Sequence, residues 1–240
     1  MNRIKVLLWD IDGTVLNFKA AEKAAVRKGF RNMSLGECTD EMISVYSDIN
    51  DKYWQLLEKG ELAKPEILVY RFRDFFIQYG IDPNLADSFN AQYQYDLGDT
   101  ICFNDNAYEL LKSLGKEYRM FAVTNGTAHA QHKKLTLSVL IDIFDDYFIS
   151  DEIGYEKPSK EYFNAVFNSI RIKFDFSPDE AMIIGDSLTS DITGGINAGI
   201  RTCWYNPGFL KNTHDLPVDF EIRNLNEIWQ ILSACGGKDD

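Results

Sequence analysis

Two carboxylates separated by one residue stand directly after the first apolar run of the chain. Asp10 and Asp12 follow residues 4–9, and Gly13 behind them permits a tight turn. If this run is a strand of a parallel sheet, the aspartates lie at the rim where such folds bind ligands. There they can act as nucleophile, as general acid and base, or as ligands of a hard metal ion. An Asp-Gly turn with incidental acids is the alternative.

Polar residues follow two further apolar runs in the same way. The sequence Thr-Asn-Gly at 124–126 comes after residues 120–123 and offers a hydroxyl and backbone N–H groups. Asp186 comes after residues 182–184, and Asp191 lies five residues later. Taken singly, these residues also fit a turn or the acidic first turn of a helix. Because each group follows a core run, we expect all of them at one rim.

Lys157, in the loop after residues 147–149, is the cation of this set. A solvated surface lysine is its ordinary alternative. At an effective dielectric of about 20, two unit charges 4 Å apart repel by roughly 4 kcal/mol. One lysine cannot offset the repulsion among four converging carboxylates and also attract a phosphate dianion. We therefore predict a bound divalent cation, Mg²⁺, which prefers oxygen ligands.

The elements that would position these residues alternate along the chain. Continuous apolar runs of strand length occupy residues 4–9, 120–123, 147–149, 182–184 and 202–205. Helical periodicity occupies residues 107–114, 128–140, 161–170 and 192–198. Such runs are typical of strands buried on both faces of a parallel sheet, and their alternation with helices indicates βαβ units. The sequence predicts an α/β fold with a Rossmann-like, doubly wound parallel sheet.

One stretch interrupts this alternation and contains only helical patterns bounded by Gly and Pro. These patterns cover residues 20–30, 40–58 and 65–80, and a fourth begins near residue 83. We therefore predict an inserted all-helical domain. The expected organisation is an α/β core over residues 1–16 and 95–232, a helical domain over 17–94, and a flexible tail over 233–240.

Composition and charge exclude several classes of function. The 240 residues are 45% hydrophobic and 26% charged, which is typical of a globular protein. The 25 Lys and Arg against 37 Asp and Glu give a net charge of −12, which disfavours nucleic-acid polymers and anionic membranes as partners. Four scattered cysteines argue against a disulfide scaffold or a zinc site and favour a cytoplasmic protein. We see no run long enough for a membrane span or a signal peptide.

Four motifs, in this order, resemble those of the haloacid dehalogenase (HAD) superfamily. They are Asp-Ile-Asp-Gly-Thr at 10–14, Thr-Asn-Gly at 124–126, Lys157-Pro158, and Gly-Asp-Ser-Leu-Thr-Ser-Asp at 185–191. The order makes the resemblance specific, and it covers the whole predicted core. The helical insertion is similar to the superfamily's cap domain.

The resemblance implies a role for each residue of these motifs. Asp10 would be the nucleophile that forms an aspartyl-phosphate, and Asp12 would be the general acid and then the base. Members that dehalogenate carbon lack an acid at the position of Asp12, so its presence favours a phosphatase. The implied catalytic residues are Asp10, Asp12, Thr124 and Lys157. The implied phosphate-binding residues are Thr124, Asn125, Gly126 and Lys157. The implied Mg²⁺ ligands are Asp10, the carbonyl of Asp12, Asp186 and Asp191.

Within the superfamily, the chain resembles the pyrimidine 5′-nucleotidases that act on noncanonical nucleotides. The similarity rests on Gly-Glu-Leu at 60–62, Tyr-Arg-Phe at 70–72 and residues 199–207. It implies a Mg²⁺-dependent hydrolase of nucleoside 5′-monophosphates that prefers pyrimidines and has a small phosphate ester as its partner. The alternatives are a sugar-phosphate or phosphoglycolate phosphatase, a phosphomutase, and a binding module without turnover.

Arg71 is the candidate for substrate specificity in the predicted cap. It would contact a substrate oxygen or a base edge, or else serve as an ordinary arginine of an amphipathic helix. The aromatic residues around it have helical spacing, which favours a role in the cap's own core over stacking on a base. They are Tyr46, Tyr53, Trp54, Tyr70, Phe72, Phe75 and Phe76.

Overall fold

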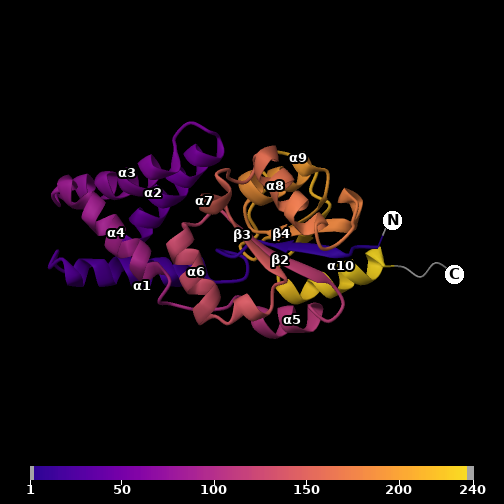
Figure 1. The fold of residues 1–240 in the computed structure, drawn as a ribbon. Coiled ribbons are helices and arrows are strands. Elements are labelled where there is room, and N and C mark those ends of the chain that lie inside the picture. Colours follow the sequence, from indigo (N-terminus) through magenta and orange to yellow (C-terminus); the bar gives the residue numbers. More distant parts are fainter. Residues whose placement is uncertain (1–2, 237–240) are drawn as a thin grey trace.

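The protein is built on a parallel β-sheet, seen in a computed structural model that describes residues 3–236 (Figure 1). Every strand pairing in it is parallel, and the strand order is β3-β2-β1-β4-β5-β6. The strands are β1 (Val6–Trp9), β2 (Arg119–Thr124), β3 (Asp146–Ile149), β4 (Ala181–Gly185), β5 (Arg201–Tyr205) and β6 (Phe220–Ile222). The strand order reverses beside β1, and this switch point is where such sheets bind ligands.

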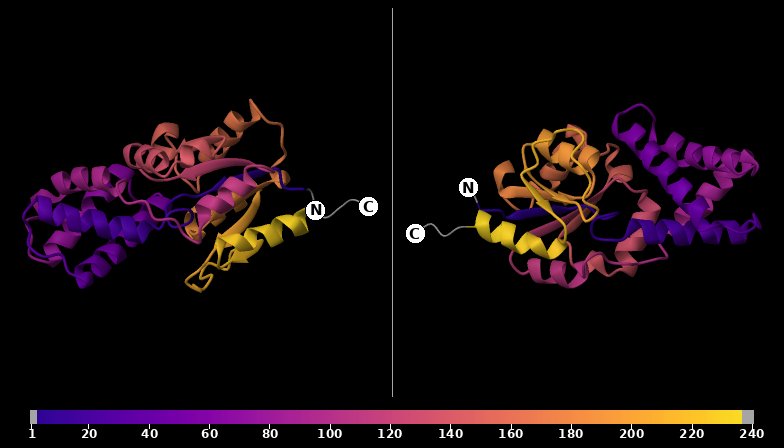
Figure 2. Two further views of the ribbon diagram at one scale, coloured as in Figure 1. Left: turned by 90° about the horizontal axis from the view of Figure 1, so that it is seen from below. Right: turned by 180° about the vertical axis from the view of Figure 1, so that it is seen from behind.

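Helices cover both faces of the sheet, because successive side chains of each strand point to opposite sides. Leu7 and Trp9 belong to one buried cluster, together with α5 (Ala107–Leu114) and α10 (Ile228–Cys235). Val6 and Leu8 belong to another, together with α8 (Lys160–Arg171). Figure 2 shows the sheet between these two layers. The predicted Rossmann-like, doubly wound parallel sheet is confirmed.

The register of the central strands aligns their carboxyl ends. Trp9, the last residue of β1, pairs with Ala122 of β2 and with Ile184 of β4. The backbone N–H of Asp10 then donates to the carbonyl of Ile184 at 2.9 Å, which continues the ladder past the strand. The residues that follow these strands therefore emerge at one level.

Several elements differ from the prediction. β6 was missed because it has three residues, with an exposed glutamate in the middle. The helix expected over 128–140 ends at Leu137 as α6 (Ala128–Leu137), and a π-helical turn, η4 (Leu188–Ile192), precedes α9 (Thr193–Ala198). The expected tail over 233–240 is wrong at its start, because α10 packs against the sheet as far as Cys235. Residues 237–240 of this expected tail lie outside the part of the chain that the structure describes.

Between β1 and α5 the regular structure is helical, with its helices grouped beside the sheet (Figure 1). This helical unit consists of α1 (Phe18–Asn32), α2 (Asp40–Glu58), α3 (Lys64–Gln78), a short 3₁₀ turn (Pro83–Leu85) and α4 (Ala86–Leu97). α4 extends past residue 94, where the sequence prediction placed the end of the insertion.

Aromatic side chains form most of the core of the helical unit. Phe72 is fully buried, and its ring centroid lies 4.8 Å from those of Tyr46 and Phe89 and 5.0 Å from that of Tyr93. Contacts of this length between rings add to the free energy of burial. The expectation that these aromatic residues pack within the unit is met by Tyr46 and Phe72, whereas Trp54 lines the cleft described below.

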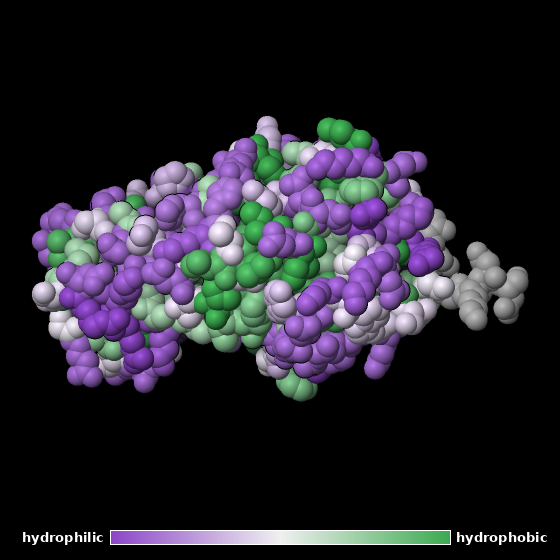
Figure 3. Space-filling view, turned by 60° about the horizontal axis from the view of Figure 1, so that its bottom comes forward, coloured by the Kyte–Doolittle hydropathy of each residue, from purple (hydrophilic) through white to green (hydrophobic). Residues whose placement is uncertain are grey.

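Hydrophilic residues cover both ends of the face drawn in Figure 3, in line with the net charge of −12, and hydrophobic residues gather near the middle of this face. None of the described helices has both the length and the apolar character needed to cross a lipid bilayer.

Replacing Phe72 by Ala should lower the free energy of unfolding of the helical unit by about 3–5 kcal/mol, because it leaves a cavity among aromatic rings. Urea denaturation followed by circular dichroism measures this loss. The matched control is Ile77→Ala on the same helix, which is exposed and should change the stability by no more than about 0.5 kcal/mol. Equal losses in the two variants would contradict this view of the core.

Candidate active site

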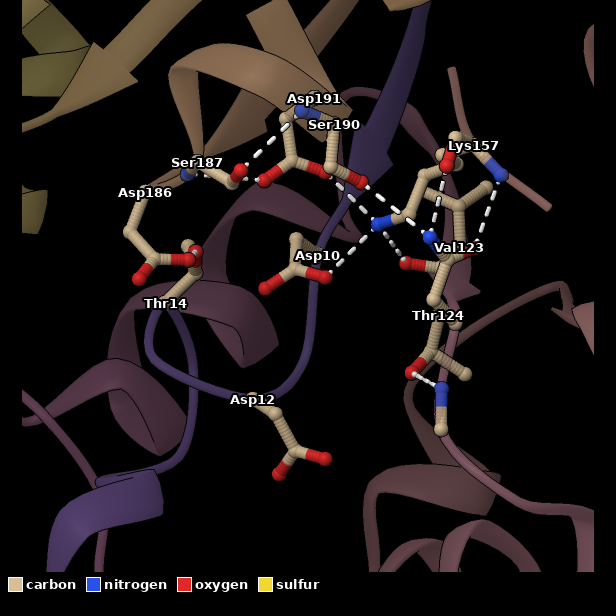
Figure 4. A network of polar contacts seen from close by, with 12 residues as sticks. Asp10, Asp12, Thr14, Val123, Thr124, Lys157, Asp186, Ser187, Ser190 and Asp191 are labelled. Carbon is tan, nitrogen blue, oxygen red and sulfur yellow. Dashed lines mark hydrogen bonds and ion pairs between the residues drawn. The ribbon is translucent and has the colours of Figure 1, made fainter. Parts of the chain in front are cut away.

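Three carboxylates meet at the carboxyl ends of β1 and β4. Asp10 follows β1, Asp186 follows β4, and Asp191 lies in η4. One oxygen atom from each lies within 4.8 Å of the others (Figure 4). Thr14 donates a hydrogen bond to Oδ1 of Asp186 at 3.3 Å. The structure thus brings together three of the four predicted acids.

Lys157 places a buried ammonium group against this cluster. Its Nζ donates to Oδ1 of Asp10 at 2.8 Å, to Oδ1 of Asp191 at 2.7 Å and to the carbonyl of Val123 at 2.9 Å. The side chain is 1% exposed, so these contacts take the place of water (Figure 4). Lys157 is therefore the predicted cation of the site and not a solvated surface lysine.

The Thr-Asn-Gly motif lies at the end of β2 and holds the Lys157 loop. The Asn125 side chain accepts a hydrogen bond from the backbone N–H of Lys157 and donates one to the Lys157 carbonyl, both at 2.8 Å. The hydroxyl of Thr124 accepts from the N–H of Gly126 at 3.1 Å. The Asn125 side chain is thus engaged with the protein, and the predicted phosphate contact of this residue falls to its backbone.

Two glycines allow close approaches that a larger residue would prevent. Gly13 has φ +97°, and a Cβ there would lie 2.3 Å from Oδ2 of Asp186. A Cβ on Gly126 would lie 2.0 Å from Nε2 of Gln131 on α6. Both distances are shorter than any van der Waals contact, and the positive φ of Gly13 favours glycine there as well, whereas the Gln131 amide that faces Gly126 is the end of a flexible side chain.

The cluster carries more negative charge than Lys157 can neutralise. Burial raises the pKa of Asp10 to about 7, and Asp191 adds to the shift while Lys157 opposes it. Desolvation, followed by repulsion from Asp10 and Asp191, raises the pKa of Asp186 well above its usual value. Burial disfavours the charged form of Lys157, yet Asp10 and Asp191 raise the pKa of this amine. Three carboxylate oxygen donors, with more negative charge than one ammonium neutralises, suit a hard divalent cation.

A second observation agrees with a metal site. Oδ2 of Asp10 is buried and has no hydrogen-bond partner among the described residues. A buried carboxylate oxygen without a partner is costly in free energy. A cation bound by Asp10, Asp186 and Asp191 would remove this cost.

The Asp12 carboxylate lies apart from the other three (Figure 4). Its oxygens accept hydrogen bonds from Nε2 of Gln131 at 2.6 Å and from Nζ of Lys134 at 2.5 Å, both on α6. The side chain of Asp12 thus stands outside the carboxylate cluster, and only its main-chain carbonyl stays a predicted metal ligand. Sequence reasoning missed Gln131 and Lys134, because nothing in the spacing of α6 links them to Asp12.

A cleft of about 740 Å³ lies between this site and the helical unit. Its volume is in the range of small-ligand pockets. One face of α2 forms a wall of the cleft, through residues that have the spacing of a single helical face. They are Asn50, Asp51, Trp54, Gln55 and Glu58. The sequence alone did not single out these residues, because polar side chains occupy other faces of α2 as well.

Arg71 does not line the cleft, which corrects the predicted contact with substrate. It is 1% exposed and lies 5.1 Å from the ring centroids of both Phe72 and Tyr93. Its Nη1 donates to Oδ1 of Asn50 at 2.6 Å. Arg71 thus meets the lining of the cleft through its hydrogen bond to Asn50.

Glu58 connects α2 with η4. Its carboxylate accepts a hydrogen bond from the hydroxyl of Thr189, so the helical unit and the core meet beside the carboxylate cluster. Burial raises the pKa of Glu58 from 4.5 to about 7. The folded state therefore favours the neutral acid, and the stability that Glu58 contributes is lost as the pH rises from about 4.5 through 7.

Glu58→Gln, which is neutral at every pH, should accordingly gain stability over the parent protein between pH 5 and pH 8. One pKa unit corresponds to about 1.4 kcal/mol, so the gain is about 3 kcal/mol at most. Urea titrations of both proteins at the two pH values, in the presence of a chelator, measure it. The exposed Glu61→Gln is the control and should show no such gain. A gain that does not depend on pH would contradict the prediction.

Comparison with known proteins by sequence gives one family. Residues 7–205 match the haloacid dehalogenase-like hydrolase family. The chain is 38% identical over 233 residues to the HAD-hydrolase YfnB of Bacillus subtilis, covering 97% of each protein. It is 33% identical over 234 residues to the pyrimidine 5′-nucleotidase PynA of Streptococcus pneumoniae, covering 95% of this chain and 94% of that protein.

Comparison of structures agrees. A crystal structure of the Bacillus subtilis YfnB protein bound to magnesium matches with a TM-score of 0.89 at 37% identity, covering 96% of this chain and 99% of that chain. All four motifs lie within the matched residues 7–205. The chain therefore belongs to the haloacid dehalogenase-like hydrolase family.

Proposed function

We propose that this hydrolase is a Mg²⁺-dependent phosphatase of nucleoside 5′-monophosphates that prefers pyrimidine bases. The observation that carries the proposal is the contact of the buried Lys157 ammonium with Asp10, at the end of a cleft that accepts a small molecule. The carboxyl group of Asp12 supports a phosphate ester as the substrate, and not a compound with a carbon–halogen bond. The relatedness to the pyrimidine 5′-nucleotidase PynA supports the nucleotide.

In the first half of the reaction, Asp10 acts as the nucleophile. One of its carboxylate oxygens forms a bond to phosphorus, while the bond from phosphorus to the ester oxygen breaks. Asp12 gives its proton to that ester oxygen, so the nucleoside leaves as a neutral alcohol. Lys157 neutralises charge on Asp10 and on the phosphoryl group, and the hydroxyl of Thr124 binds a phosphoryl oxygen.

In the second half, water releases the phosphate. Asp12, now a carboxylate, takes a proton from the attacking water. The water oxygen bonds to phosphorus as the bond between phosphorus and Asp10 breaks. Inorganic phosphate leaves, and Asp10 and Asp12 return to their starting states.

Mg²⁺ would be held by Asp10, Asp186 and Asp191 together with the main-chain carbonyl of Asp12. Bound there, it would neutralise negative charge on the nucleophile and on the transferring phosphoryl group.

We also propose that the helical unit, α1 to α4, is a cap domain and that the sheet with its covering helices is the catalytic core, so that the boundary predicted after residue 94 moves to the end of α4 at Leu97. The cap's contribution is the wall formed by α2. Trp54 offers an aromatic surface for a base, and Gln55 offers an amide group for its polar edge. This combination favours a nucleoside over glycolate or a sugar as the leaving group.

Phosphate release from a panel of esters tests the substrate. The panel contains pyrimidine and purine nucleoside 5′-monophosphates, sugar phosphates and phosphoglycolate, all with Mg²⁺. We expect kcat/KM for a pyrimidine nucleotide to exceed that for the other classes by about tenfold or more, which corresponds to about 1.4 kcal/mol in the transition state. A tenfold preference for sugar phosphates would overturn the nucleotide proposal and leave the phosphatase chemistry standing. Transfer of the phosphoryl group to a second alcohol, without free phosphate, would indicate a mutase.

Asp10→Asn tests the nucleophile. We expect turnover to fall by about a thousandfold or more, with the melting temperature preserved, because an amide cannot form the acyl phosphate. The exposed Asp142→Asn is the control and should retain full activity. Substantial phosphate release by Asp10→Asn would refute covalent catalysis at this residue.

Removal of the metal gives an independent test. Excess chelator should abolish phosphate release, and Mg²⁺ should restore it. Mg²⁺ should also raise the melting temperature of the parent protein but not that of Asp186→Asn, since that variant lacks one of the proposed ligands. Full turnover in chelator would contradict the metal requirement.

A further inference from the structure

Two side chains of α6 hold the Asp12 carboxylate, and neither has a role in the reaction as described so far. Nζ of Lys134 lies 2.5 Å from Oδ1 of Asp12, and Nε2 of Gln131 lies 2.6 Å from Oδ2. Each oxygen of the carboxylate thus has its own donor. Because both oxygens are fixed, the plane of the carboxylate is fixed as well.

The burial of these two donors makes the arrangement specific. Lys134 is 1% exposed and Gln131 is 0% exposed. A buried ammonium group is destabilising unless a carboxylate pairs with it. Within residues 3–236, Asp12 is the one carboxylate within ion-pair distance of Lys134, and the ring of Phe18 is its other neighbour, at 5.4 Å. The ion pair with Asp12 thus explains how Lys134 can be buried at this position.

Gln131 is itself held in place. Its backbone N–H donates to the carbonyl of Thr127 at 2.9 Å, and its side chain fills the space that a Cβ on Gly126 would occupy. The loop proposed to bind the phosphate and the residue that holds Asp12 are therefore in direct contact. The Asp12 side chain keeps 19% exposure, and Asp12 lines the cleft.

We propose that Lys134 and Gln131 are positioning residues for the proton transfers of Asp12. They fix its carboxylate apart from the metal ligands, on the side of the cleft where the leaving alcohol departs. The inference rests on the proposed role of Asp12 as general acid and base. Neither residue touches the substrate. Replacing them should therefore slow the reaction of esters whose leaving group needs a proton, and it should not weaken phosphate binding.

The test compares two esters that differ in this need. Uridine 5′-monophosphate has a strongly basic leaving group that needs a proton. p-Nitrophenyl phosphate has a weakly basic leaving group that departs without one. Stopped-flow single turnovers measure formation of the phosphoenzyme from each ester in Lys134→Met, Gln131→Leu, Lys134→Arg and Asp12→Asn. The control is Lys173→Met, an exposed lysine paired with Asp146 away from the site.

We expect Lys134→Met and Gln131→Leu to slow the reaction of uridine 5′-monophosphate by about tenfold to a hundredfold, since a misplaced group costs rates of this order. The burst of nitrophenolate should keep its rate within about twofold, and KM for both esters should change little. The steady-state rate after the burst should fall, because Asp12 is also the base for hydrolysis. Lys134→Arg should restore part of the rate, and Lys173→Met should resemble the parent protein.

The outcomes separate the two proposals. If Asp12→Asn slows both esters equally, Asp12 is not the general acid, and both the mechanism and this inference fail. If Asp12→Asn discriminates between the esters and the α6 variants do not, the inference alone fails. Unchanged or faster turnover of uridine 5′-monophosphate in both α6 variants would overturn it as well. If Lys134→Met does not fold, Gln131→Leu carries the same test.

Discussion

The site depends on one buried ammonium group. Nζ of Lys157 lies between the carboxylates of Asp10 and Asp191 and is closed off from water. A buried cation is stable there only because two anions face it, and the anions approach each other only because the cation lies between them. This mutual requirement explains why Asp10 stays near a loop that begins far away in the chain. It also leaves net negative charge, which a divalent cation can neutralise.

The sheet makes this convergence possible at little conformational cost. Parallel strands in register deliver Asp10, Thr124 and Asp186 to one rim, and each needs only to continue its strand. Side chains then set the finer positions. Asn125 fixes the Lys157 loop, and Gly13 permits its loop to pass against Asp186. In the proposed reaction, the core would hold the reacting groups in place before any ligand binds, an arrangement that lowers barriers.

The helical unit and α6 supply what the rim lacks. In the proposed reaction, the rim would bind the phosphoryl group, and the leaving group would need a further surface. α2 offers that surface through residues such as Trp54, and the buried Arg71 donates a hydrogen bond to Asn50 of α2. α6 holds Asp12 through Lys134 and Gln131. The proposed chemistry and the proposed recognition of the nucleoside are therefore assigned to different elements that meet at one cleft.

The sequence alone determined the strand–helix alternation, the helical insertion and the identity of Asp10, Asp186, Asp191 and Lys157. They follow from local periodicity and from motifs that lie at strand ends. Both signals are contained in short stretches of the chain and can be recognised without the folded structure. It did not reveal β6, the partners of Asp12 or the wall formed by α2. Those depend on side chains distant in sequence, as Lys134 is from Asp12. Only the folded packing decides which of many buried or polar residues meet, and it placed Arg71 inside the helical unit because aromatic rings and Asn50 satisfy its guanidinium there.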